Sequence, residues 1–202
     1  MMEAVFLGGS RRIARLNASM RAKLDELVTR GLWMVVGDAN GADRALQQYL
    51  ADRGYERVIV YAVTGFLRNN VGHWKVRSVD APKGARGFDL YSVKDVQMAK
   101  DASYGLMLWD GKSRGTLENV FNLLTQGKPV AVHLGTARRF VSLRSPADLH
   151  KIGLAPNTEL GGQHDLPLGA AQPTAPPYGR APLYSEAAQP KRKRAANVRG
   201  RG

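Results

Sequence analysis

The sequence contains no cysteine, and none of its apolar runs is long enough to cross a membrane. With no cysteine in 202 residues, disulfides and cysteine-based zinc or redox chemistry are excluded. A membrane helix needs roughly 18 or more consecutive apolar residues, and no stretch approaches that length. The chain also does not open on a charged and then apolar signal peptide, so we expect a cytoplasmic location.

Histidine is also scarce, with four residues that lie far apart along the chain. No pair has the His-x-x-x-His spacing, and no carboxylate cluster accompanies them, so we expect neither a bound metal nor a cofactor. His133 falls within an apolar run, where we interpret it as a hydrogen-bonded core residue.

Negative charge is in short supply, because 30 Lys and Arg face 17 Asp and Glu, for a net charge of +13. Residues 151–202 hold eight of these cations and only three of the carboxylates. Such an excess indicates contact with a polyanion or with a small anionic ligand, and charge alone does not choose between them. The run Lys191–Arg194 could make weak nonspecific contact with nucleic acid or could simply aid solubility.

Short apolar runs alternate with helical patterns over most of the chain. Runs of strand length are Ala4–Leu7, Trp33–Val36, Arg57–Tyr61, Tyr104–Trp109 and Pro129–Leu134, with Phe140–Leu143 as an edge strand. Helical patterns cover about 17–30, 42–54, 92–100 (with Ser92 and Asp95 as a capping box), 116–126 and a short turn from Ser145. Apolar strands separated by helices favour a parallel sheet covered on both faces. We predict an α/β, Rossmann-like, doubly wound fold with a mostly parallel sheet of five or six strands.

Composition changes near residue 154. Residues 1–153 are predicted to form the binding domain, whereas residues 154–202 are rich in Pro, Ala and Gly and end in the basic run. A segment so poor in large aliphatic residues is predicted to be disordered. Within the domain, the long segment Thr64–Asp89 has no clean period and is predicted to be a lid or binding loop.

Three turns follow predicted strands and precede predicted helices. Such a turn presents free backbone N–H groups beside the positive end of a helix dipole, which suits phosphate. Neither the dinucleotide fingerprint nor a Walker A loop is present. The predicted nucleotide-binding residues in these turns are Gly8, Gly9, Ser10, Arg11, Gly37, Asp38, Asn40, Gly41, Asp43, Asp110, Gly111, Ser113, Gly115 and Thr116.

Four candidate positions have two interpretations each. Trp74 or Phe66 could stack on a base, with Arg68 or Arg77 at its phosphates, or Trp74 could hold the long loop against the domain. Asp110 and Glu118 are candidate catalytic carboxylates, although Asp110 also fits a turn residue and Glu118 a partner of the helix dipole. Asp43 could likewise act only as a dipole partner at the start of its helix.

Taken together, these motifs resemble the SLOG superfamily, which groups the DNA-processing protein Smf/DprA with the Lonely Guy phosphoribohydrolases. The matching residues are Gly8–Arg11, Gly37–Asp43, Lys94–Ala102 and Trp109–Thr116, and the resemblance is strongest to the small YpsA-like members of unassigned activity. It covers about residues 1–135 and implies a Rossmann-like fold with nucleotides or nucleotide sugars at these turns.

One departure concerns the hydrolase motif Pro-Gly-Gly-x-Gly-Thr-x-x-Glu. After Gly115 and Thr116, Asn119 stands at the offset of the catalytic glutamate, and Glu118 comes one residue early. One residue rotates a helical side chain by about 100°, so Glu118 is predicted to point elsewhere.

The sequence therefore predicts a protein that binds a nucleotide or nucleotide-derived small molecule as a sensor or binding module. One alternative is an N-glycosidic hydrolase or transferase acting on nucleoside monophosphates, with Glu118 or Asp110 as its carboxylate. A second alternative is a nucleic-acid-binding protein of Smf type. No membrane contact is expected, and the long loop leaves room for a homodimer interface.

Overall fold

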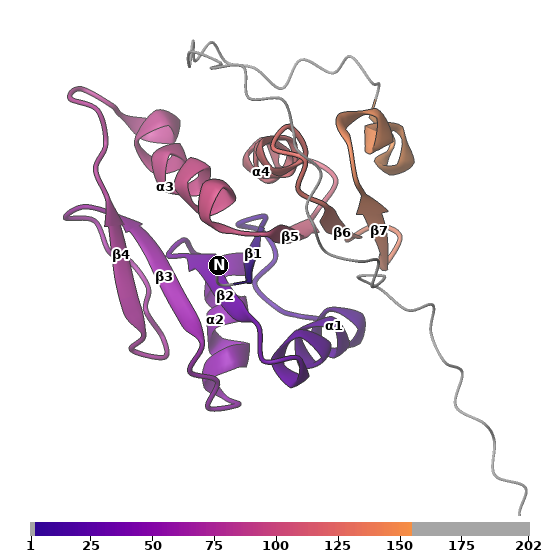
Figure 1. The fold of residues 1–202 in the computed structure, drawn as a ribbon, viewed down its shortest axis with the longest axis horizontal. Coiled ribbons are helices and arrows are strands. Elements are labelled where there is room, and N and C mark those ends of the chain that lie inside the picture. Colours follow the sequence, from indigo (N-terminus) through magenta and orange to yellow (C-terminus); the bar gives the residue numbers. More distant parts are fainter. Residues whose placement is uncertain (1–2, 155–202) are drawn as a thin grey trace, which may run out of the picture. The chain divides into compact units, whose positions relative to one another are not determined.

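A computed structural model of the protein describes residues 3–154, which form a seven-stranded, mostly parallel sheet with the order β4-β3-β2-β1-β5-β6-β7 (Figure 1). The strands are β1 (Ala4–Gly9), β2 (Trp33–Gly37), β3 (Val58–Val63), β4 (Lys75–Val79), β5 (Tyr104–Trp109), β6 (Val130–Leu134) and β7 (Arg139–Leu143). All neighbouring strands are parallel except β7, which pairs antiparallel with β6. The predicted fold class is confirmed.

Helices cover both faces of this sheet. The helices are α1 (Ala18–Thr29), α2 (Ala42–Ala51), α3 (Gly87–Asp101) and α4 (Arg114–Leu124), followed by the 3-10 helix η1 (Pro146–Ile152). In Figure 1, α1 and α2 lie on one face, and α3 and α4 lie on the other. From β1 the chain continues to β2, β3 and β4 on one side of β1, and it then crosses to β5 on the other side of β1. The strand order therefore reverses between β1 and β5, and sheets of this kind bind ligands at such a switch point.

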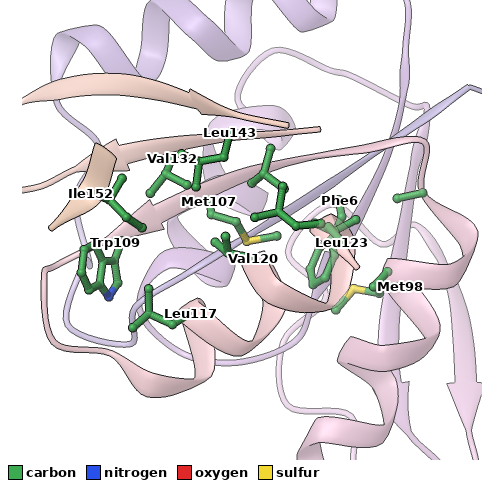
Figure 2. Close-up of a cluster of buried hydrophobic side chains, with 14 of the residues drawn as sticks. Phe6, Met98, Met107, Trp109, Leu117, Val120, Leu123, Val132, Leu143 and Ile152 are labelled. Carbon is green, nitrogen blue, oxygen red and sulfur yellow. The ribbon is translucent and has the colours of Figure 1, made fainter. Parts of the chain in front are cut away.

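The apolar strand residues pack against the helices on the face of α3 and α4. Phe6 of β1 and Met107 of β5 are buried beneath Leu123 of α4 (Figure 2). The other side chains labelled there are Met98, Trp109, Leu117, Val120, Val132, Leu143 and Ile152. This continuous core fixes the ends of β1 and β5 relative to α3 and α4, and therefore fixes the turns at the switch point.

Three predictions of the elements were wrong in detail. The sheet has seven strands instead of five or six, because Lys75–Val79 forms an edge strand inside the segment expected to be a loop. Its residues are exposed or half-buried, so it lacks the apolar run that marks a buried strand. Helix α3 begins at Gly87 and not near 92, and the hydroxyl of Ser92 donates to the Asp89 carbonyl instead of capping the helix.

No helix within residues 3–154 is both long enough and apolar enough to span a membrane. The predicted basic tail lies outside the described residues, apart from residue 154.

Candidate functional site

A cavity of about 620 Å³ opens at the switch point, and we call it the main cavity. It is bordered by the β1–α1 turn, the β5–α4 turn and the first half of α3. Its cationic lining residues are Arg11, Arg12, Arg68, Lys94, Lys112 and Arg114, and its carboxylates are Asp43, Asp95 and Asp110. Cations therefore outnumber carboxylates around a space large enough for a nucleotide-sized ligand.

The β1–α1 turn can follow this path only because residue 9 is glycine. A Cβ on Gly9 would lie 2.4 Å from the Leu108 carbonyl oxygen, closer than carbon and oxygen can approach. The turn continues with a hydrogen bond of 2.9 Å from the Ser10 amide to the same carbonyl. Gly8, Gly9, Ser10 and Arg11 all line the main cavity, as a phosphate-binding turn requires.

The β5–α4 turn is organised by Asp110. Its Oδ1 accepts hydrogen bonds from the amides of Lys112 (3.0 Å) and Ser113 (2.8 Å), and Gly111, directly after Asp110, has φ +82°. Burial alone would raise the pKa of Asp110, but these two amides, Ser10 and Arg12 outweigh it and hold the pKa below its ordinary value. Asp110 is therefore an ionised residue that shapes the turn.

Helix α4 starts at the cavity wall. The Ser113 hydroxyl caps it by accepting from the Thr116 amide (3.4 Å) and the Thr116 hydroxyl (3.0 Å). Gly115, in the first turn, keeps this wall open, because a Cβ there would extend to 3.4 Å from Phe88. Ser113, Gly115 and Thr116 all line the main cavity, so the positive end of the α4 dipole faces the ligand space.

Asn119, at the hydrolase offset, and Glu118, one residue before it, face different surroundings. Asn119 lines the main cavity, and its Nδ2 lies 3.4 Å from Asp95 Oδ2. Glu118 does not line the cavity, and its carboxylate accepts a hydrogen bond of 2.8 Å from Arg114. This is the difference in direction expected from one residue of helical rotation.

The β2–α2 turn lies mostly behind the cavity wall. Gly41 has φ +82°, and a Cβ there would lie 2.2 Å from the Arg11 carbonyl oxygen. The Ala42 amide donates to the Ser10 carbonyl (3.1 Å), so this turn supports the β1–α1 turn from behind. Of the predicted residues in the β2–α2 turn, Asp43 lines the main cavity, whereas Gly37, Asp38, Asn40 and Gly41 do not.

Five charged side chains beside the cavity form what we call the buried charge network, in which Asp38, Asp43 and Lys94 are buried and Arg68 and Asp95 are partly exposed. Lys94 Nζ lies 2.6 Å from Asp95 Oδ1 and 4.0 Å from Asp38 Oδ1. Arg68 holds the other side of Asp38 through its Nη2 at 2.7 Å and its Nε at 3.1 Å. The network joins α3 to β2 and the β3–β4 loop, and thus fixes the floor of the cavity.

Burial and pairing set the protonation states of this network. Asp43 is buried, with 7% of its surface exposed, and burial raises its pKa to about 6 even though the neighbouring Lys94 ammonium opposes the shift. Burial would lower the pKa of Lys94, but the carboxylates of Asp95, Asp43 and Asp38 outweigh burial, and the pKa lies above its usual value. Lys94 is therefore charged at neutral pH, and Asp43 titrates just below neutral pH.

Aromatic side chains reach the cavity from α3 and not from the β3–β4 loop. Trp74 does not line the cavity, and its indole Nε1 donates to the Tyr55 carbonyl (2.8 Å), which ties the loop to the domain. Phe88 lines the cavity with 51% of its surface exposed. Tyr91 also lines it, and the Arg68 guanidinium lies 4.4 Å from its ring centroid.

Sequence reasoning did not select Phe88, Tyr91 or Lys94 as binding residues, whereas it considered Arg68 as a phosphate partner in the long loop. Lys94 was noted only within a matching motif, and no local pattern separates Phe88 and Tyr91 from surface residues. Among residues 3–154, no group of three or more His, Asp or Glu side chains could hold a metal ion.

The predicted core role of His133 is confirmed. It is fully buried, and its Nε2 lies 3.2 Å from the Ser19 hydroxyl and 3.3 Å from Asn17 Nδ2. Its ring also packs edge-on against Phe140, with centroids 4.9 Å apart.

Comparison with known proteins yields a likeness of fold. No protein-family model matches the chain, and no curated protein matches it. Among solved structures, DNA processing protein A from Helicobacter pylori, which binds single-stranded DNA, matches with a TM-score of 0.48 and 15% sequence identity. The match covers 64% of this chain and 64% of that protein, so less than two thirds of its length is represented. At this identity, the likeness concerns the arrangement of strands and helices.

Proposed function

We propose that residues 1–153 form a domain that binds a nucleotide or nucleotide-derived small molecule in the main cavity, as a sensor or binding module. The observation that carries this proposal is one cavity that combines two glycine-dependent turns, the start of α4 and an excess of cations. We place the protein with the small YpsA-like members of the SLOG superfamily, on the motif resemblance described above.

The phosphate is proposed to lie between the β1–α1 and β5–α4 turns. Arg11 and Lys112 are exposed there, and within residues 3–154 neither forms an ion pair, so both are available to an anion. The backbone at Gly8 and Gly9 carries no side chain that would keep a phosphate away. The first turn of α4 adds the positive end of its dipole.

The base is proposed to lie against the aromatic side of the cavity. Phe88 exposes half of its surface, a state in which a large apolar ring gains from being covered. Tyr91, with Arg68 stacked on it, offers a second flat surface nearby on the same helix. Base stacking on such rings contributes about 1–3 kcal/mol per base.

Catalysis of N-glycosidic cleavage has less support from the geometry. Asp110 uses its Oδ1 in two backbone hydrogen bonds, and Glu118 does not line the cavity and is paired with Arg114. Binding without turnover is therefore the proposed activity, and release of free base from a nucleoside monophosphate is the assay that separates the two.

Isothermal titration calorimetry with a panel of nucleoside 5′-monophosphates and nucleotide sugars tests the proposal. We expect at least one compound to bind, and Arg11→Ala to weaken it about tenfold, because hydrogen bonds between charged partners contribute about 1.5–3 kcal/mol. Arg44→Ala is the matched control, because Arg44 is also exposed but lies outside the cavity.

Gly115→Ala is the sharper variant. The added methyl would make ordinary contact with Phe88 at 3.4 Å, so the domain should fold, but the methyl narrows the cavity at the start of α4. We expect a clear loss of affinity with an unchanged melting temperature. Absence of binding by every compound, or wild-type affinity in both Arg11→Ala and Gly115→Ala, would refute the proposal.

A further inference from the structure

A second hollow of about 740 Å³ adjoins the main cavity along the same edge of the sheet, and we call it the lateral hollow. Its polar lining residues are Arg12, Arg15, Asn17, Asp110, Thr136 and Arg138. Arg12 and Asp110 line both spaces, so the two spaces meet at this pair.

The wall between the two spaces is made of tightly connected turns. The Gly135 amide of the β6–β7 turn donates to the Trp109 carbonyl at 2.8 Å. A Cβ on Gly111 would lie 3.8 Å from the Thr136 methyl group. The lateral hollow is therefore held in a fixed position relative to the proposed phosphate site of the main cavity.

The charge of the lateral hollow is strongly one-sided. Three arginines face one carboxylate, and Asp110 already accepts two backbone hydrogen bonds and lies 3.5 Å from Arg12. Arg15 and Arg138 are exposed and form no ion pair with any other residue of 3–154. Two guanidinium groups without partners beside a hollow favour a ligand with phosphate oxygens.

The backbone of Arg138 is a second, independent observation. Its φ of +50° lies in the left-handed region, where Gly or Asn is usual and a long side chain is uncommon. Arg138 keeps this unfavourable backbone conformation at the rim of the lateral hollow, which indicates that its side chain has a binding role there.

We propose that the lateral hollow binds a second phosphate of the ligand held in the main cavity, with Arg15 and Arg138 as its partners and Arg12 between the two sites. The ligand would then be a nucleotide with phosphates at two separate positions and not a simple nucleoside monophosphate. This inference rests on the proposed function. The second phosphate could belong to a small bisphosphate or to the next unit of a single strand.

The test is calorimetric titration of the full chain with three probes: nucleoside 5′-monophosphates, the matching 3′,5′-bisphosphates and a 5′-phosphorylated hexadeoxynucleotide. We expect the bisphosphate or the hexanucleotide to bind about tenfold more tightly than the monophosphate, as one added charge-assisted contact provides. Tighter binding of the bisphosphate than of the monophosphate would identify the ligand as a small bisphosphate. Tighter binding of the hexanucleotide alone would identify it as a single strand.

Arg138→Asn should remove this gain and leave monophosphate binding unchanged, because asparagine tolerates the left-handed backbone but carries no charge. Arg15→Ala should act in the same way, and Arg44→Ala should change neither affinity. Equal affinity for all three probes, or a gain that survives both variants, would overturn the inference and leave the proposed function standing. Failure of every probe to bind would overturn the inference, and failure of the nucleotide sugars as well would overturn the proposed function.

Discussion

Replacing Lys94 with methionine removes the ammonium at the centre of the buried charge network but keeps most of the aliphatic side chain. The network then holds the carboxylates of Asp38, Asp43 and Asp95 against the single guanidinium of Arg68. Its formal charge changes from −1 to −2 in a region where Lys94 and Asp38 are at most 4% exposed. We expect Lys94→Met to be among the most destabilising single changes in the domain.

The magnitude follows from the distances. Charges about 4 Å apart, as Lys94 Nζ and Asp38 Oδ1 are, interact by about 4 kcal/mol at an effective dielectric constant of about 20. Removing one partner of a buried ion pair usually costs about 3–5 kcal/mol, because an uncompensated charge remains. We therefore expect Lys94→Met to lower the free energy of unfolding by about 3–5 kcal/mol at pH 8.

Asp43 makes this loss depend on pH. Its pKa of about 6 is raised from 3.8, so the folded protein binds the proton more readily than the unfolded chain between these values. Stability therefore falls as the pH rises from about 4 to 6, and ionising Asp43 costs about 3 kcal/mol at about 1.4 kcal/mol per pKa unit. Without Lys94 the cost grows, so the destabilisation should be smaller at pH 5 than at pH 8.

Urea denaturation of the wild type, Lys94→Met, Asp43→Asn and the double variant at pH 5 and pH 8 measures these energies. Asp43→Asn restores the charge of the network on the Lys94→Met background, so the double variant should recover at least about 2 kcal/mol at pH 8. A loss below about 1 kcal/mol for Lys94→Met would refute the reasoning. Strictly additive effects at pH 8 would show that Lys94 and Asp43 do not interact.

Three further predictions concern single residues. Gly9→Ala should destabilise the domain by about 1–3 kcal/mol in urea denaturation, because its Cβ would lie 2.4 Å from the Leu108 carbonyl oxygen; wild-type stability would contradict the geometry of this turn. Burial lowers the pKa of His133 from 6.5, so its contribution to stability is complete above pH 6.5 and is lost as the pH falls below that value. His133→Leu should therefore make the urea midpoint less sensitive to pH between 7.5 and 5.5, and an unchanged sensitivity would count against this. Glu118→Gln should leave ligand affinity unchanged and reduce stability by less than about 0.5 kcal/mol, because it weakens only a pair with the largely exposed Arg114; a large loss of affinity would place Glu118 in the site.

Local patterns in the sequence were enough to predict most of the architecture. Continuous apolar runs such as Tyr104–Trp109 mark strands buried on both faces, and all of β5 is buried. The edge strand Lys75–Val79 was missed, because it is only half-buried and has no such run. A short helix from Ser145 was expected, because serine caps helices and proline suits a first turn, and the structure has the 3-10 helix Pro146–Ile152 there, with a capping box of Ser145 and Asp148.

The candidate site divides in the same way. The sequence by itself determined that glycines end β1 and follow β5 and that Asn119, instead of a glutamate, occupies the hydrolase offset, because turn conformation and helical rotation are local properties. Only the tertiary structure decided that Lys94 meets Asp38 and that Phe88 covers the opening beside Gly115. These pairs come from segments far apart in the chain, and their contacts depend on how α3 packs against the sheet and α4, which no local pattern specifies.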